Sequence, residues 1–168
     1  DLCSVFHQTT LMKNLCFATI ILVATAVFTS AQTTDSKAIL RPGDALVAQE
    51  NYKLAIEEYR KVSTRDRDGF ARATYNIGVC YYELWQTDDA IEFYKRAIEL
   101  KQGDYPKASY ALGVALEDQD KTAEARKSYE QAVSASRGEL ARATYRIGLL
   151  EAKAGEFKKA EVLFREAA

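Results

Sequence analysis

Apolar residues recur with a helical period through most of the chain after residue 38. Four segments carry small and aromatic residues at i, i+4 and i+7, with Glu, Lys and Arg between them: 51–62, 87–98, 121–133 and 156–167. These spacings place the apolar residues on one face of an α-helix, so each segment predicts an amphipathic helix with one buried stripe. Three further apolar segments each precede one of these helices: 71–84, 108–118 and 143–153. The pattern therefore predicts an all-α protein built from pairs of helices.

The stripe repeats along the chain at intervals of 35 residues, as four columns show. A glycine column stands at Gly43, Gly78, Gly113 and Gly148. An alanine column stands at Ala55, Ala90, Ala125 and Ala160. An aromatic column stands at Tyr59, Tyr94, Tyr129 and Phe164, and a column of small residues stands at Val62, Ala97, Ala132 and Ala167. Columns that share one period indicate a structural repeat.

The columns have a packing explanation. Glycine in the first helix and alanine in the second allow two antiparallel helices to approach closely, and the aromatic residue four positions later fills the space between one unit and the next. A single helix pair cannot bury its stripe alone, so several pairs must stack. Pro106 stands at a first-turn position, where its missing N–H costs little, and Gly103 and Gly138 mark the joints between units.

These columns resemble the tetratricopeptide repeat, which has Gly at position 8 of its unit, Ala at 20, Tyr or Phe at 24 and a small residue at 27. The resemblance covers residues 38–168 and implies a right-handed α-solenoid of four helix-turn-helix repeats. The units are expected at about 36–70, 71–105, 106–140 and 141–168. The unit is one residue longer than the usual 34 of the family.

Three of the residues that depart from the family pattern affect the expected structure. Pro42 stands inside the first helix of unit one, which it is expected to shorten or kink. Glu151 stands in unit four where Tyr81 and Leu116 stand in the neighbouring units. Trp85 occupies the turn of unit two, where the family usually has glycine. Packing of Trp85 over the neighbouring helix ends is the preferred interpretation, and a contact with a partner is the alternative.

The resemblance also implies a binding groove. In this family positions 2, 5, 9 and 12 of each first helix line the concave face, and this spacing lies on one side of a helix. The groove residues carried over in this way are Arg72, Tyr75, Val79, Tyr82, Lys107, Tyr110, Val114, Glu117, Arg142, Tyr145, Leu149 and Ala152. Asn76 and Arg146 join the set because they match single positions of the two-carboxylate clamp found in chaperone-binding members, although the full clamp is not present in this sequence.

Two of the groove columns have a constant chemistry. Position 2 is basic in Arg72, Lys107 and Arg142, and position 5 is tyrosine in Tyr75, Tyr110 and Tyr145. Tyrosine rings beside a row of cations suit an extended peptide, because the rings give contact area and the cations pair with acidic groups. The alternative is that the tyrosines pack between adjacent first helices while the cations are merely solvated. The sequence leaves both open.

The first 31 residues are interpreted as a targeting segment. Met12 and Lys13 begin a short basic region, an uncharged apolar run follows at 15–28, and small residues precede Gln32. This order is typical of a secretory signal peptide, here 12–31. The run is shorter than the ~20 residues that a membrane-spanning helix needs, so cleavage is favoured over an uncleaved anchor. Residues 1–11 are interpreted as upstream read-through or a misassigned start, and 32–37 as a short linker.

Removal of this segment leaves little catalytic chemistry. The mature chain would keep one cysteine, Cys80, and no histidine, which excludes Ser-His-Asp, Cys-His and His- or Cys-clustered zinc sites. Cys80 is expected to be a buried small hydrophobe. The acidic pairs 57–58 and 88–89 are expected on helix surfaces rather than in an acid–base site. Lys+Arg (23) and Asp+Glu (24) nearly balance, which argues against nucleic-acid binding. No cofactor, metal or enzymatic activity is predicted.

The sequence thus predicts an exported, non-catalytic scaffold, periplasmic or elsewhere in the bacterial cell envelope, that binds an extended peptide or a partner helix in its groove. The identity of the protein partner is open. One alternative is the helical N-terminal part of a longer envelope enzyme, or of an assembly or secretion-machine subunit, truncated at residue 168.

A carbohydrate-binding role would rest on Trp85 alone. The stripe of the fourth unit has no next unit to cover it, so self-association is expected through Ala160, Leu163, Phe164 and Ala167.

Overall fold

The computed structural model describes residues 36–138 and 140–168. The described residues form eight α-helices: α2 (Ser36–Val47), α3 (Tyr52–Arg60), α4 (Arg67–Glu83), α5 (Thr87–Leu100), α6 (Pro106–Asp118), α7 (Thr122–Ala135), α8 (Ala141–Lys153) and α9 (Phe157–Glu166). The predicted upstream segment 1–11 and signal peptide 12–31 lie outside the described residues. The first helix begins at Ser36, at the end of the predicted linker.

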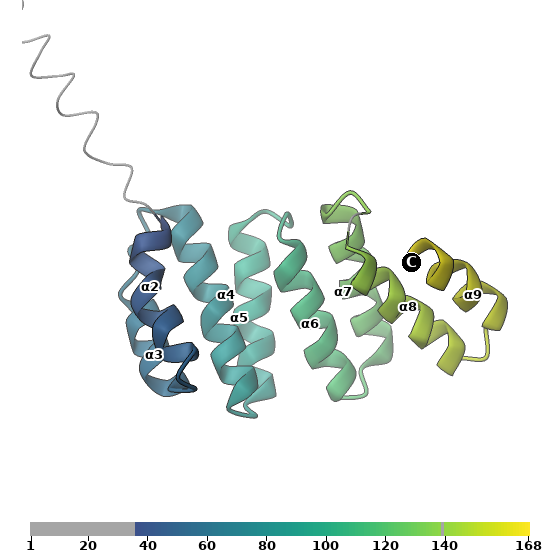
Figure 1. The fold of residues 1–168 in the computed structure, drawn as a ribbon, viewed down its shortest axis with the longest axis horizontal. Helices are drawn as coiled ribbons and strands as arrows, with labels where there is room; N and C mark the ends of the chain where they lie inside the picture. Colours follow the sequence, from purple (N-terminus) through teal and green to yellow (C-terminus); the bar gives the residue numbers. More distant parts are fainter. Residues whose placement is uncertain (1–35, 139) are drawn as a thin grey trace, which may run out of the picture. The chain divides into compact units, whose positions relative to one another are not determined.

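The helices pack in the order that a stack of pairs requires (Figure 1). Each first helix contacts the second helix of its own unit, in the pairs α2–α3, α4–α5, α6–α7 and α8–α9. The second helix then contacts the first helix of the next unit, as α3 does with α4, α5 with α6 and α7 with α8. The predicted all-α helical-repeat fold is therefore confirmed.

The glycine and alanine columns mark the close contacts inside each unit. A Cβ added at Gly78 would lie 2.8 Å from the ring of Tyr94, and one at Gly113 would lie 2.4 Å from the ring of Tyr129. Ala90 and Ala125 are fully buried where the paired helices meet. The predicted close approach of the two helices is confirmed. Each aromatic ring lies against the glycine of its own unit, so the expectation that it fills the space between one unit and the next is wrong.

The turn inside each unit has a constant backbone conformation. Its last residue has a positive φ in all four units: Glu50 (59°), Trp85 (61°), Asp120 (58°) and Gly155 (84°). The next residue donates its N–H back into the helix, as Gln86 does to the carbonyl of Tyr81 at 2.9 Å, and this bond ends the helix. Trp85 is 91% exposed, so the interpretation that it packs over the neighbouring helix ends is wrong. Its backbone occupies the left-handed region while its ring stays in solvent.

The two prolines behave differently. α6 begins at Pro106, which confirms the predicted first-turn position. α2 continues through Pro42 and spans 12 residues, against 13 for α6 and α8. Pro42 therefore does not end the helix that contains it.

The fourth unit exposes apolar side chains in addition to those that the sequence predicts. Phe164 packs against Gly148, and its ring centroid lies 5.2 Å from that of Tyr145. Ala160 is buried. The exposed apolar side chains of α9 are Phe157 (72%) and Val162 (54%). Ala160 is therefore not part of an uncovered stripe, whereas Leu163, Phe164 and Ala167 are half-buried, and Phe157 and Val162 add to the apolar surface available for self-association.

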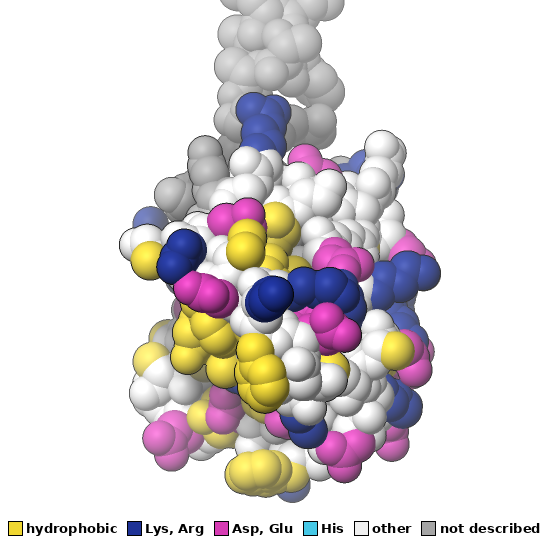
Figure 2. Space-filling model, turned by 90° about the vertical axis from the view of Figure 1, so that its right-hand side faces the viewer, with side chains coloured by type: hydrophobic (Ala, Val, Ile, Leu, Met, Phe, Trp, Pro, Cys, Tyr) yellow, Lys and Arg dark blue, Asp and Glu magenta, His cyan; other side chains and the backbone are white. Residues whose placement is uncertain are grey.

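An ion pair replaces two apolar residues between the third and fourth units. Glu151 is 3% exposed, and its carboxylate Oε1 lies 2.5 Å from Nη1 of Arg126. Arg126 stands in the column that Ile56 and Ile91 occupy in the first two units. The two substitutions compensate each other, because a buried carboxylate without its cation would be strongly destabilising. Beside the pair, residues of α7, α8 and α9 line an open pocket of about 570 Å³. Hydrophobic side chains gather below a row of Lys and Arg on the face of the molecule at this end of the array (Figure 2).

Ala90→Leu should overpack the contact between α4 and α5 and lower the free energy of unfolding by about 1–3 kcal/mol. The matched control is Ala123→Leu, because Ala123 lies exposed on α7. Urea denaturation of both variants measures the difference. Equal unfolding free energies for the two would contradict the packing described for the alanine column.

Candidate functional site

The first helices bring half of the predicted groove residues together around one cavity. Its volume is about 210 Å³. The lining residues are Tyr75, Val79 and Tyr82 of α4, Tyr94 of α5, Lys107, Tyr110, Ala111 and Val114 of α6, and Arg142 of α8. Seven of these nine were predicted, and Tyr94 and Ala111 were not. The spacing of three and four residues places the predicted ones on one side of each first helix, and stacking aligns those sides.

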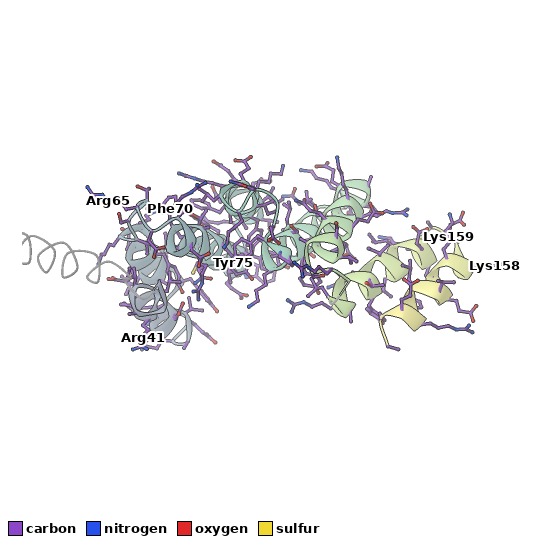
Figure 3. The ribbon with its side chains drawn as sticks, turned by 90° about the horizontal axis from the view of Figure 1, so that it is seen from above. Arg41, Arg65, Phe70, Tyr75, Lys158 and Lys159 are labelled. Carbon is purple, nitrogen blue, oxygen red and sulfur yellow. The ribbon has the colours of Figure 1, made fainter. Side chains whose placement is uncertain are left out.

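The tyrosines of the groove rest on aromatic rings. Tyr75 lies with its ring centroid 5.8 Å from that of Tyr94 and 5.4 Å from that of Tyr105, near the middle of the described array (Figure 3). The ring centroid of Tyr110 lies 5.6 Å from that of Tyr129. Each tyrosine is thus supported by the aromatic column of its own unit, and the rings of Tyr75 and Tyr110 also line the cavity. Tyr145 of the fourth unit is exposed and lies outside it.

The basic column spans adjacent units. The guanidinium carbon of Arg142 lies 4.6 Å from the ring centroid of Tyr110, so this side chain reaches from α8 back to α6 and makes a cation–π contact. Lys107 is exposed at the same cavity. Arg72 lies nearer the N-terminal end of α4. Burial raises the pKa of the Tyr105 phenol to about 12, and the charge of Arg72 opposes this rise. Two of the three predicted cations therefore border the cavity.

Three other predicted groove residues are engaged elsewhere. Glu117 accepts a hydrogen bond from Tyr129 Oη at 2.8 Å and pairs with Arg146, whose Nη1 lies 3.5 Å away. Asn76 donates to Oδ1 of Asp44 at 3.3 Å. Glu117, Asn76 and Arg146 are thus not brought into the central cavity. Leu149 is exposed and Ala152 half-buried on α8, both outside the cavity.

Tyrosine–carboxylate bonds are a feature that sequence reasoning missed. Tyr59 Oη donates to Oδ1 of Asp44 at 2.6 Å, and Tyr129 Oη donates to Glu117. Both tyrosines belong to the aromatic column, and both carboxylates stand on the first helix of the same unit. The signal was present in the sequence, because Asp44 and Glu117 occupy groove positions 9 and 12. The pairing was missed because those positions were assigned to ligand contacts only.

Tyr94 is the exception in this column. Its unit carries Val79 and Tyr82 at positions 9 and 12. Tyr94 is 2% exposed, and no group in residues 36–138 or 140–168 accepts a hydrogen bond from its hydroxyl. Burial raises the pKa of Tyr94, and it likewise raises the pKa of Tyr59 and Tyr129. The hydroxyl therefore stays protonated and keeps a donor available at the cavity.

The described residues contain no arrangement typical of catalysis. Cys80 is fully buried and free, as predicted, and burial raises the pKa of its thiol to about 11. Glu57 and Glu58 form surface ion pairs with Arg60 and Lys61, which confirms their structural role. Within the described ranges no three His, Cys, Asp or Glu side chains gather as a metal site would require. None of the helices described is both long and apolar enough to cross a membrane.

The chain is similar to known repeat proteins. The family model described as tetratricopeptide repeat matches residues 40–109 and 110–168. A solved structure titled "Crystal structure of MamA" has 26% identity and a TM-score of 0.68, with 84% of this chain and 81% of that chain covered. A second, "Crystal structure of MamA protein", has 27% identity and a TM-score of 0.66, with coverage of 82% and 74%. MamA 41-end from Desulfovibrio magneticus RS-1 has 20% identity and a TM-score of 0.64, with coverage of 81% and 75%, and supports the fold alone. No curated protein sequence matches the chain.

Removal of one hydroxyl should affect the three column tyrosines differently. Tyr59→Phe and Tyr129→Phe each leave a carboxylate without its donor and should lower the free energy of unfolding by about 1–2 kcal/mol. Tyr94→Phe breaks no hydrogen bond and should leave that free energy unchanged or raise it. Chemical denaturation of the three variants tests this. A loss for Tyr94→Phe as large as for the other two would show that its hydroxyl has a partner within the protein.

Proposed function

The chain belongs to the tetratricopeptide-repeat family, and on this premise we propose that it is a scaffold of the bacterial cell envelope that binds an extended peptide on the face formed by α4, α6 and α8. Members of the family are typically non-catalytic and bind protein partners. Stacked repeats of this kind present extended binding surfaces. The partner is therefore a protein, and the proposed face is the one that the first helices share.

The observation that carries the proposal is the cavity between the second and third units. Its walls are four tyrosine rings, two valines and Ala111, and Lys107 and Arg142 lie beside them. Rigid aromatic walls give contact area at a low cost in conformational entropy, and cations at a rim select acidic groups. A volume of about 210 Å³ suits one side chain rather than a whole helix. An extended peptide presents single side chains to such pockets while its backbone continues along the groove.

A peptide selected from a displayed random library against the full protein would serve as the probe. Val114→Arg places a long side chain in the cavity and should weaken binding of that peptide by at least about tenfold, or about 1.4 kcal/mol. Val162→Arg is the matched control, because it makes the same change on the exposed face of α9. Fluorescence anisotropy gives the affinities, and circular dichroism checks that both variants are folded. Equal affinities for the two variants would rule out the cavity as the binding site.

The envelope location is proposed from the residues before the described helices. The basic region at Met12, the apolar run at 15–28 and the small residues before Gln32 have the order of a secretory signal. Mass spectrometry of the protein from fractionated bacteria should find an N-terminus at Gln32 in the soluble envelope fraction. Recovery from the membrane of a product that keeps residues 15–28 would contradict this location.

A further inference from the structure

The first and third units each contain a carboxylate where the second unit has none. In unit one the hydroxyl of Tyr59 donates to Asp44, and in unit three that of Tyr129 donates to Glu117. In unit two the corresponding first-helix positions hold Val79 and Tyr82, and Tyr82 donates to Asp118 of α6 at 2.5 Å. In two units the tyrosine of the aromatic column thus bonds to a carboxylate, and in unit two no carboxylate of the first helix occupies the corresponding position beside Tyr94.

The cavity that Tyr94 lines is bordered by two cations and by no carboxylate, while Glu83 acts on the Tyr94 phenol from outside this lining. Tyr94 is 2% exposed, and it lines the cavity of about 210 Å³. Neither Asp nor Glu is among the lining residues. Lys107 and Arg142 border the same space, and neither forms an ion pair in the described part of the chain. In unit three, by comparison, Glu117 lies between Tyr129 and the cation Arg146.

We propose that this cavity binds a carboxylate group of the bound peptide. Tyr94 Oη donates a hydrogen bond to one carboxylate oxygen, and Lys107 and Arg142 balance the charge. The incoming group would complete in unit two the arrangement that Glu117 completes in unit three. Hydrogen bonds to a charged acceptor are among the stronger ones in proteins, and they are stronger still where water is excluded. The inference rests on the proposed groove function and specifies the residue that the groove selects: Asp, Glu or a C-terminal carboxylate.

Three small probes test the site without a peptide ligand. N-acetylglutamate N-methylamide carries a side-chain carboxylate, N-acetylalanine carries a terminal one, and N-acetylglutamine N-methylamide is the neutral counterpart of the first. Each is titrated into the full, isotope-labelled protein while nuclear magnetic resonance follows the signals of Lys107, Tyr110 and Arg142. Probes of this size are expected to bind in the millimolar range. At least one carboxylate probe should shift these signals, and the glutamine probe should not. The carboxylate that binds identifies the source as a side chain or a chain terminus.

Two matched variants assign the effect to the hydroxyl. Tyr94→Phe should weaken the carboxylate probe about tenfold, since it removes the hydrogen bond to the charged group. Tyr59→Phe makes the same change in unit one, outside the cavity, and should bind the probe as the unchanged protein does. Thermal melts establish that both variants are folded. The carboxylate site is overturned if neither carboxylate probe shifts the signals, if the glutamine probe binds equally, or if Tyr94→Phe binds as well as Tyr59→Phe. The selected peptide and Val114→Arg would still decide the groove function separately.

Discussion

The contact between a glycine and an aromatic ring inside each helix pair is the constraint on which the rest of the structure depends. Any side chain at Gly43, Gly78, Gly113 or Gly148 would run into the ring opposite, because the Cβ itself would lie 2.4–2.8 Å from a ring atom. The alanine column lets the backbones approach, and the ring then fills the space that the glycine leaves. Overpacking of such a close-packed interior destabilises the fold. The repeat of this contact every 35 residues explains why the pairs are alike and can stack.

The same contact determines the chemistry of the first-helix face. Because each ring packs against the first helix of its unit, the hydroxyl of each tyrosine in the column lies next to residues of the groove. In two units the hydroxyl donates a hydrogen bond to a carboxylate of the same chain, so neither group is left free for a ligand. In the second unit it meets a cavity with two cations beside it, and in the fourth Phe164 has no hydroxyl. The same contact thus gives three kinds of surface in the four units. The Tyr94 hydroxyl has no acceptor among the described residues and borders a cavity, which is why the exception at Tyr94 points to a ligand.

Much of this could be predicted from the sequence, because the columns follow directly from packing. The fold, the four units, the buried Cys80 and most of the cavity lining came from periodicity and from the family's groove positions. The remaining features depend on distances between units. The ion pair of Arg126 with Glu151 needs α7 to lie against α8, and a single column shows only half of it. Trp85 was assigned to packing from its apolar ring, yet the turn places it in solvent. The role of Tyr94 became visible only when its hydroxyl could be compared with those of Tyr59 and Tyr129.

The central claim is that the face of α4, α6 and α8 is where a partner binds. Site-specific photo-cross-linking in the native bacterium tests it most directly, with a benzoylphenylalanine at Leu149 on the first-helix face and, in a separate strain, at Leu54 on α3. Both side chains are exposed, Leu149 by 36% and Leu54 by 57%, so the control position is at least as accessible as the test position. Binding on this face predicts a defined protein adduct from position 149 that is lost when Arg142→Glu is added, and no such adduct from position 54. An adduct from position 54 alone, or one from 149 that does not depend on Arg142, would contradict it.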